Sequence, residues 1–201
     1  MFRFVTMSLQ IQPLIAYFNR IHPLNTSEIE FVEKAFQMRK VKRGQFILQE
    51  GDVCKHNTFV VEGCFKMYLV DDNGKEHNLQ FAIENWWIGD IASFHNETPT
   101  KLNIEALENS SILQIKKEEQ HKLFVDFPLF NRIFRVLAEN AMVAMQHRIL
   151  QNIGSTAEER YLDFLKRYPQ LFNRISNVQI ASYLGVTPEF LSAIRKKIVE
   201  A

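Results

Sequence analysis

The chain has few cysteines and no excess of charge of one sign. Its 201 residues include only Cys54 and Cys64, too few for the disulfide framework of a small secreted protein or for a four-cysteine iron–sulfur or zinc site. The 24 lysines and arginines nearly balance the 23 aspartates and glutamates, which leaves a formal net charge of +1. This balance excludes a protein held to nucleic acid or membrane by bulk charge, so any basic surface must be local.

Long hydrophobic runs are missing as well. Charged or amide residues interrupt every apolar stretch before it reaches the roughly 18 residues of a membrane span, and the opening Met1–Met7 is too short for a signal-peptide core. We therefore expect a cytoplasmic protein without a membrane partner. With 46% hydrophobic residues, 23% charged residues and 17 phenylalanines, the composition is typical of a globular protein with a sizeable core.

The pattern of the chain changes twice along its length. Up to about residue 40 the apolar residues recur at helical spacing. Short runs rich in Phe, Val, Ile and Leu then alternate with glycines, and residues 71–74 are a good hairpin turn, because Asn-Gly adopts the positive φ angles of a tight reversal. The expected strands include 45–49, 58–61, 65–70, 78–83, 104–107 and 111–115. Seven or more strands at this spacing predict a jelly roll, and the helical period returns after Lys116, so the fold class is α+β.

Residues 131–153 form the longest apolar helical segment. Between Ala141 and Met145 the apolar residues cover the whole circumference, so this helix must be covered on more than one side. Two interpretations stay open. The helix is either sandwiched within its own domain, or it packs on the barrel and also meets a partner subunit. Gly154 then ends the segment at a plausible domain junction.

Residues 178–197 have the pattern of helix, tight turn and helix. Gly185 stands where the turn needs a left-handed residue, and Ala181 is small where two crossing helices would touch. Thr187 can cap the second helix and Pro188 suits its first position. Apolar residues occupy the positions that a helix-turn-helix buries in its shared core: Ile180, Leu184, Val186, Leu191 and Ile194.

The second of these helices is expected to have two different sides. Its inner side would hold Phe190, Leu191, Ile194 and Ile198. The outward side would face the major groove of DNA, where small and polar side chains permit close approach and basic ones neutralise phosphates. The predicted DNA contacts are Thr187, Glu189, Ser192, Ala193, Arg195, Lys196 and Lys197. The alternative is a pair of bundle helices whose basic end is merely solvated.

Four strings of residues stand in order before the long helix: 43–52, 59–68, 72–76 and 88–90. Together with the C-terminal helix-turn-helix they resemble the Crp/Fnr family of bacterial transcription regulators, from about residue 10 to the end. The resemblance implies three parts. These are a cyclic-nucleotide-binding-like double-stranded β-helix, or jelly roll, with flanking helices over residues 1–130, a dimerisation helix over 131–153 and a helix-turn-helix DNA-binding domain over 154–201.

The same resemblance implies function and partners. It implies a homodimeric transcription regulator that binds double-stranded DNA, with RNA polymerase as a candidate further partner and an unknown small-molecule effector. The long helix would meet its copy through Phe134, Leu137, Ala141 and Met145. Residues 104–108 and the short end without an obvious β-wing resemble the branch of the family common in Bacteroidetes.

The segment that binds cyclic AMP in family members departs from the family pattern. Those members carry Gly-Glu and, further along, an arginine that pairs with the cyclic phosphate. Here Gly89 precedes Asp90, and residues 98–102 hold Lys101 but no arginine, so the bidentate phosphate grip is lost and we expect cyclic AMP to bind poorly or not at all. A remaining effector pocket would be lined by Trp87, Gly89, Asp90, Ile91, Ala92 and Lys101, with ordinary barrel packing as the alternative for Trp86 and Trp87.

The recognition helix departs as well. Where many relatives place an arginine for a guanine edge, this chain has Ala193, and Pro188 occupies another position that is often polar. Base reading would then fall to Glu189, Ser192 and Lys196. We therefore expect an unusual or relaxed sequence preference.

Two other classes of protein compete with a regulator. An enzymatic jelly roll such as a cupin would need a histidine cluster for a metal, and the six histidines are isolated from one another in the sequence, so we expect no enzyme, no metal and no haem. Cys54 and Cys64 are expected to be buried strand residues. The second alternative is a small-molecule sensor or interaction protein on the same fold with weak or lost DNA binding.

Overall fold

The structure is a computed structural model that describes the backbone of residues 2–200 and the side chains of residues 10–198. Met1 and Ala201, the outer limits of the predicted domains, lie outside the described residues. Contacts divide the chain into two compact units. Unit 1 consists of Met1–Met67 and Phe81–Glu139, and unit 2 of Tyr68–Gln80 and Asn140–Ala201.

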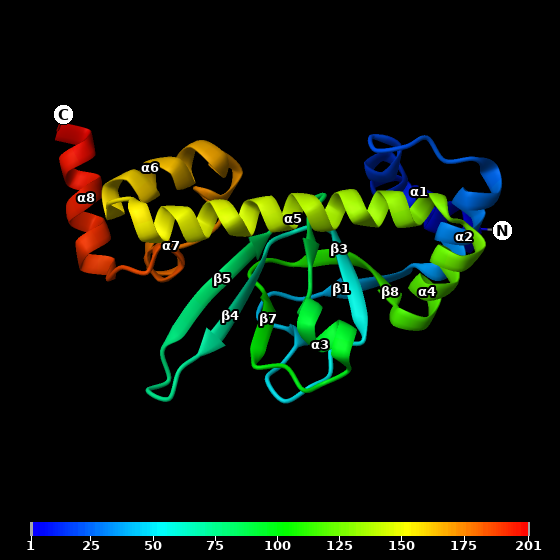
Figure 1. The fold of residues 1–201 in the computed structure, drawn as a ribbon, viewed down its shortest axis with the longest axis horizontal. Coiled ribbons are helices and arrows are strands. Elements are labelled where there is room, and N and C mark those ends of the chain that lie inside the picture. Colours follow the sequence, from blue (N-terminus) through cyan, green and yellow to red (C-terminus); the bar gives the residue numbers. More distant parts are fainter. Residues whose placement is uncertain (1, 201) are drawn as a thin grey trace. The chain divides into compact units, whose positions relative to one another are not determined.

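Unit 1 combines helices with most of the strands (Figure 1). Its helices are α1 (Phe2–Asn19), α2 (Thr26–Ala35), α3 (Ile91–Asn96), α4 (Lys117–Asp126) and the first part of α5 (Leu129–Gly154). The strands are β1 (Gln37–Val41), β2 (Phe46–Leu48), β3 (His56–Glu62), β4 (Phe65–Val70), β5 (Glu76–Ala82), β6 (Trp87–Ile88), β7 (Leu102–Ala106) and β8 (Ser110–Lys116). The end of β4 from Tyr68, the hairpin turn, and β5 as far as Gln80 belong to unit 2.

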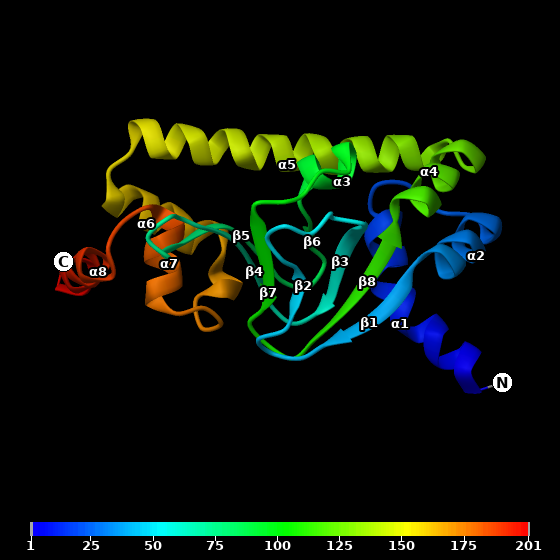
Figure 2. The ribbon, with the colours of Figure 1, turned by 90° about the horizontal axis from the view of Figure 1, so that it is seen from below.

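The strands form two four-stranded sheets, with the orders β1-β8-β3-β6 and β2-β7-β4-β5. Figure 2 shows β1, β8 and β3 side by side in the first sheet. Antiparallel register sets Arg39 opposite Ile112 and Thr58 opposite Gln114. Because side chains alternate between the two faces of a strand, one face of this sheet holds these residues. The other face holds Phe59 and its neighbours on the adjacent strands.

An aromatic core fills the space between the first sheet and the helices of unit 1. The ring of Phe18 on α1 lies 5.5 Å from that of Phe130, and the ring of Trp87 lies 5.3 Å from Phe59 and 5.6 Å from Phe134, in edge-to-face geometry. Such pairs add about 0.5–1.5 kcal/mol beyond the burial of their area. A second, aliphatic core lies inside the roll and includes Val60, Ile88, Ile104 and Ile112.

The α+β fold class and the jelly roll are confirmed, with corrections at particular elements. The hairpin turn predicted at residues 71–74 is present, and Gly74 has a φ of 78°. Strand β1 was not predicted, because among its five residues only Val41 is buried and no apolar alternation is visible. Cys54 and Cys64 are buried as expected, but they flank β3 and lie outside the strands.

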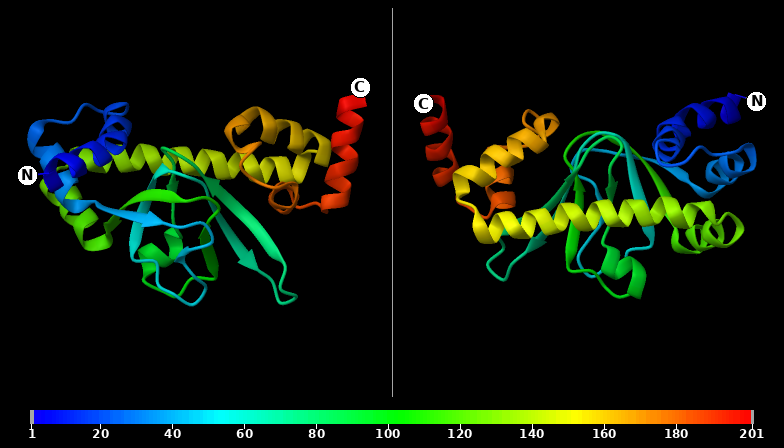
Figure 3. Two further views of the ribbon diagram at one scale, coloured as in Figure 1. Left: turned by 180° about the vertical axis from the view of Figure 1, so that it is seen from behind. Right: turned by 45° about the horizontal axis from the view of Figure 1, so that its top comes forward.

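Unit 2 contains the rest of α5 followed by α6 (Ala157–Arg167), the short helix η1 (Pro169–Leu171), α7 (Asn177–Leu184) and α8 (Pro188–Glu200). Figure 3 shows α6 to α8 from two sides, in orange to red. Capping boxes fix two helix starts: the side chains of Thr156 and Ser176 accept from the backbone N–H of Glu159 and Gln179. Each such cap stabilises its helix by about 1 kcal/mol. Within residues 2–200, no helix is long and apolar enough to cross a membrane.

Candidate functional site

Helices α7 and α8 pack through a small apolar interface. Ala181 is completely buried and Leu191 is 1% exposed, which agrees with a small residue at the point where the two helices touch. Ile180, Leu184 and Ile194 are also buried, whereas Val186 is only half-buried. Four of the five predicted core positions are therefore buried in a helix-turn-helix arrangement.

Local backbone chemistry sets the turn between the two helices. Gly185 ends α7 in the left-handed region with a φ of 70°, and its N–H donates to the carbonyls of Ala181 and Ser182. The hydroxyl of Thr187 accepts from the N–H of Phe190 at 3.2 Å, as expected for the cap of α8. Pro188 is the first residue of α8, where its missing N–H leaves no donor without a partner.

The outward side of α8 is small and polar, as predicted. Glu189, Ser192, Ala193 and Lys196 are all exposed. The hydroxyl of Ser192 donates to the carbonyl of Pro188 at 2.9 Å, so its oxygen still has lone pairs for a donor from outside. We call these four residues together with Phe190 the outward face of α8.

Phe190 is the one residue of α8 that the sequence assigned to the wrong side. Its side chain is 53% exposed. Leu191 and Ile194 direct the helix inward, and since successive helical residues turn by about 100°, Phe190 falls at the edge of the outward face. Ile198, assigned to the same inner side, is half-buried.

Two of the predicted phosphate contacts have partners inside unit 2. The guanidinium of Arg195 donates to the carboxamide oxygen of Asn177 and lies 5.8 Å from the ring of Phe172. The ammonium of Lys197 lies 2.6 Å from a carboxylate oxygen of Glu158 on α6. Both side chains join α8 to neighbouring helices, so phosphates would have to compete for them.

The start of strand β5 is hydrogen-bonded to the first helix of the helix-turn-helix. The hydroxyl of Ser182 on α7 accepts from the N–H of Asn78 at 3.0 Å and donates to the carbonyl of Glu76 at 2.7 Å. The carboxamide nitrogen of Asn78 donates to the carbonyl of Gln179 at 3.2 Å. Because these partners are more than a hundred positions apart in the sequence, sequence analysis had no local signal for the contact.

Arg148 of α5 completes this connection. Its guanidinium donates to the backbone carbonyls of Leu79, of Asn78 at 3.0 Å and of Tyr183 at 3.0 Å. It also lies 4.1 Å above the ring of Tyr183, a cation–π contact. Burial raises the pKa of Tyr183 to about 12, so its phenol stays neutral. One side chain thus joins α5, β5 and α7.

The predicted contacts of the dimerisation helix fall into two groups. Phe134 and Leu137 pack on the aromatic core of unit 1, so their intrachain contacts already bury part of each side chain. Ala141 and Met145 are exposed, as are Met142, Ile149 and Ile153, the last at 80%. Met142, Met145, Ile149 and Ile153 recur at intervals of three and four residues, which puts them on one stripe of the helix. We call these four residues the α5 stripe.

Residues 89–101 correspond to the segment that binds cyclic nucleotides in the family that this chain resembles. Here Asp90 forms hydrogen bonds with other residues of the same segment. One carboxylate oxygen of Asp90 accepts from the N–H groups of Ala92 at 2.9 Å and Ser93 at 3.1 Å, capping α3. The other accepts from the hydroxyl of Thr100 at 2.6 Å. These three hydrogen bonds hold the Asp90 carboxylate within its own segment.

The remaining predicted pocket residues are dispersed. Trp87 packs in the aromatic core, the packing that was the alternative for it, whereas Ile91, Ala92 and Lys101 are exposed. Gly89 alone among the six lines the cavity of unit 1 that the structure shows between its sheets. The structure therefore does not bring these residues together around one space.

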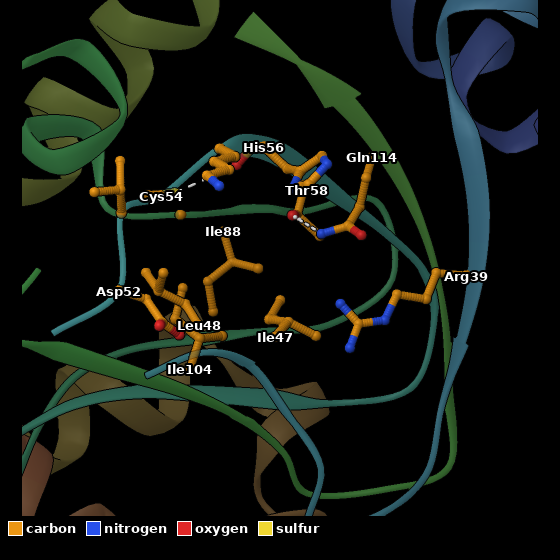
Figure 4. A pocket seen from close by; sticks show the side chains of 13 residues that line it. Arg39, Ile47, Leu48, Asp52, Cys54, His56, Thr58, Ile88, Ile104 and Gln114 are labelled. Atoms are coloured by element: carbon orange, nitrogen blue, oxygen red, sulfur yellow. Dashed lines mark hydrogen bonds between the residues drawn. The ribbon is translucent and has the colours of Figure 1, made fainter. Parts of the chain in front are cut away.

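That cavity lies inside the jelly roll and has a volume of about 280 Å³. Figure 4 shows its side chains. Its lining combines aliphatic residues with charged and polar ones: Arg39, Ile47, Leu48, Asp52, Val53, Cys54, Lys55, His56, Thr58, Ile88, Gly89, Ile104 and Gln114. Among the described side chains, no three of His, Cys, Asp or Glu are grouped as a metal would require.

Comparison with known proteins gives matches to a domain family and to regulators. Residues 38–126 match the family model of the cyclic nucleotide-binding domain. The transcriptional activator protein Anr of Pseudomonas protegens is 24% identical over 184 residues, which cover 85% of this chain and 74% of the relative. The transcriptional activator protein FnrA of Stutzerimonas stutzeri is 24% identical over 168 residues, which cover 78% of this chain and 68% of the relative.

Solved structures share the fold. FixK2 from Bradyrhizobium japonicum superposes with a TM-score of 0.72 at 18% identity, covering 82% of this chain and 85% of the other. The c-di-GMP-responsive global regulator CLP of Xanthomonas campestris superposes with a TM-score of 0.70 at 16% identity, covering 88% and 92%. At these identities the likeness shows the fold alone.

Proposed function

Because this chain belongs to the Crp/Fnr family of transcription regulators, with a cyclic nucleotide-binding domain over residues 38–126, we propose that it is a homodimeric regulator that binds operator DNA through α8. Its curated relatives are transcriptional activators and not enzymes. The sign of its effect on transcription and any contact with RNA polymerase depend on where the operator lies.

The outward face of α8 is the observation on which the proposal depends. Ser192 and Ala193 are exposed, and their small size lets the helix backbone approach base edges in the major groove. Exposed Glu189 can accept from the amino group of a cytosine, and Phe190 can contact the methyl group of a thymine. Lys196, also exposed, lies one turn further along, where a phosphate can be reached.

A second copy of the chain is the partner that fits the α5 stripe. Met142, Met145 and Ile149 follow one another at three and then four residues, as in a coiled-coil seam, and Ile153 lies one turn beyond Ile149. Each of these side chains is more than half exposed. A helix that pairs with its own copy buries this stripe on both sides. Two recognition helices related by a two-fold axis then read two half-sites about one turn of DNA apart.

Cyclic AMP is not the effector of this regulator in the manner of the family. The carboxylate of Asp90 is occupied by three donors, and Lys101 is exposed on a segment without arginine. A lysine offers a point charge where a guanidinium would offer two parallel hydrogen bonds. The effector, if one controls α5, must be held by other residues.

Selection of bound fragments from the source genome tests the function. We expect the full-length protein to enrich a small set of fragments that share a palindrome, and its affinity for them to fall steeply with salt, because phosphate neutralisation releases counterions. Weak binding without sequence preference at physiological salt would instead favour a sensor or interaction protein that has lost DNA binding.

A further inference from the structure

The jelly-roll cavity has one aliphatic wall and one polar wall. Ile47, Leu48, Ile88 and Ile104 form the aliphatic wall. The polar wall comes from the first sheet, where Arg39, Gln114 and the β3 residues His56 and Thr58 share the inner face. Figure 4 shows the guanidinium of Arg39 directed into the cavity. The cavity therefore offers an apolar surface beside a positive charge.

The charge of Arg39 is not neutralised by a carboxylate. Its guanidinium donates only to the carbonyl oxygen of Phe46, at 3.3 Å, and no carboxylate of the described residues forms an ion pair with it within 4.0 Å. Asp52 is the acid of the lining, and Figure 4 places it across the cavity from Arg39. A guanidinium with one long bond to a neutral acceptor keeps most of its donors for a ligand.

Further donors and cations surround the same space. Lys55 and His56 also line it. Burial and then the nearby charges of Lys116, Arg39 and Lys55 lower the pKa of His56, while the charge of Glu118 works to raise it. The side-chain amide of Gln114 donates to the hydroxyl of Thr58 at 3.1 Å, so the hydroxyl hydrogen of Thr58 remains for another acceptor.

We propose that this cavity binds a small organic anion, with its carboxylate on the guanidinium of Arg39 and its apolar body against Ile47, Leu48 and Ile104. The fork of a guanidinium matches a carboxylate with two parallel hydrogen bonds. A volume of about 280 Å³ is just below the range of about 300–1,000 Å³ for ligand pockets, so the body is a single ring or a short chain. The binding itself stands apart from the proposed function, and only the role of this anion as the effector rests on it.

The site differs from the nucleotide grip of the family in its residues. The cation comes from β1 and the additional donors from β3, whereas the segment from Gly89 to Lys101 contributes only Gly89 to the lining. Sequence analysis missed Arg39 because no local pattern indicates that β1, β3 and β8 bring these residues together.

Titration of the full-length protein with ligands of one shape and different charge tests the site. Benzoate, benzamide and benzylamine share a ring, and hexanoate offers a chain with the same carboxylate. Because hydrogen bonds to charged groups contribute about 1.5–3 kcal/mol, we expect calorimetry to give benzoate or hexanoate an affinity at least about tenfold above that of benzamide, and benzylamine the weakest. Equal affinity for the acid and the amide, or no binding of either anion at millimolar concentration, would overturn the proposal.

Arg39→Gln and Lys101→Gln are a matched pair of variants. Each removes one exposed cation from unit 1, and melting temperatures check that both variants fold. Arg39→Gln is expected to lower the affinity for the anion about tenfold or more and to leave that for benzamide unchanged, whereas Lys101→Gln leaves both unchanged. Loss of anion binding in Lys101→Gln alone would place the site at the family loop and refute our assignment.

Operator binding separates this proposal from the proposed function. If the anion binds through Arg39 but no genomic fragment is enriched, the cavity site is supported and the proposed regulator function is refuted. If fragments are enriched and no anion binds, the proposed regulator function is supported and the cavity site is refuted. If the anion is the effector, it must change the operator affinity of the wild-type protein and leave the operator affinity of the Arg39→Gln variant unchanged. An equal change in both proteins contradicts that role.

Discussion

The two units of this chain use their large apolar side chains in different ways. In unit 1 the aromatic residues are inside, and the large apolar side chains that stay exposed among its described residues are Ile91 and Val125. In unit 2 the exposed ones are Leu79, Met142, Val143, Met145, Ile149, Leu150, Ile153, Leu162, Phe172, Val178 and Phe190. Since burial of apolar surface stabilises a protein, the difference agrees with the proposal that unit 2 binds partners, whereas unit 1 buries most of its large apolar side chains within the chain.

Helix α5 shows this difference within one element. Its first part places Phe130 and Ile133 in the aromatic core with complete burial. Its second part has a similar apolar composition, yet Met142 and Ile153 are 72% and 80% exposed. Composition and period are therefore the same for the buried and the exposed part of this helix, which is why the sequence left both interpretations open.

The largest expected effect is the loss of an aromatic ring from unit 1. Phe18 has no exposed surface and contacts Phe36, Trp87 and Phe130. Phe18→Ala should lower the free energy of unfolding by about 3–5 kcal/mol, because it leaves a cavity in a rigid aromatic core. Denaturant unfolding measures this, and Ile91→Ala is the control, with a change within about 0.5 kcal/mol. Equal effects of the two variants would contradict the contrast between buried and exposed residues.

Charge on the α5 stripe should separate the subunits. Ile149→Asp combined with Ile153→Asp puts two carboxylates into the seam, so we expect a monomer and an operator affinity that falls about 100-fold or more, because the second half-site no longer contributes. Sedimentation and gel shift measure the two quantities. Val125→Asp adds charge at an exposed apolar residue of unit 1 and should change neither. A dimeric double variant would show that the stripe is not the interface.

We expect the ring of Phe190 to contact the methyl group of one thymine in the operator. If its ring contacts a thymine methyl, replacing that thymine by uracil weakens wild-type binding by about 1 kcal/mol or more, since a good base contact contributes roughly 1–3 kcal/mol. Phe190→Ala should weaken binding to the thymine operator and lose the distinction between the two bases. The test fails if uracil at every position leaves the wild-type affinity unchanged.

The smallest expected effect concerns acid stability in unit 2. Burial works to raise the pKa of Asp163, but hydrogen bonds from His147 at 2.9 Å and Arg167 at 3.1 Å outweigh it, so this pKa lies below its usual value. The ionised carboxylate therefore stabilises the fold fully above the unfolded pKa of about 4, and this contribution disappears as pH falls through the folded pKa.

Asp163→Asn should lower the free energy of unfolding by about 0.5 kcal/mol at neutral pH, as is typical of partly exposed ion pairs. The difference from the wild-type protein should shrink as the pH is lowered from about 5 to about 2. Urea unfolding across this range measures it. A difference that does not change with pH would assign the effect to packing.

Local rules account for the parts that could be predicted from the sequence. Gly185, Ala181 and Thr187 each obey a rule that involves only a few neighbouring residues, so the helix-turn-helix was predictable with its boundaries nearly correct. The jelly roll followed from glycine spacing and the Asn-Gly turn. Phe190 was assigned to the wrong side because a helical period fixes a face only to within about one residue.

Contacts between distant segments account for the parts that could not be predicted. Arg39 faces the cavity only because β1 pairs with β8, and β8 with β3. Asn78 meets Ser182 across more than a hundred residues. The closure of Asp90 on Thr100 depends on where the chain returns after α3. None of these contacts can be recognised from the residues next to either partner in the sequence.

The most direct test of the account is the operator affinity of a variant with a carboxylate on the outward face of α8. Ser192→Glu places negative charge and bulk where we expect the floor of the major groove, whereas Gln170→Glu adds the same charge at an exposed residue of η1. With the selected operator and one salt concentration, we predict that Ser192→Glu lowers affinity by about 100-fold or more and that Gln170→Glu lowers it by less than about threefold. Wild-type affinity in Ser192→Glu would contradict the claim that α8 reads DNA.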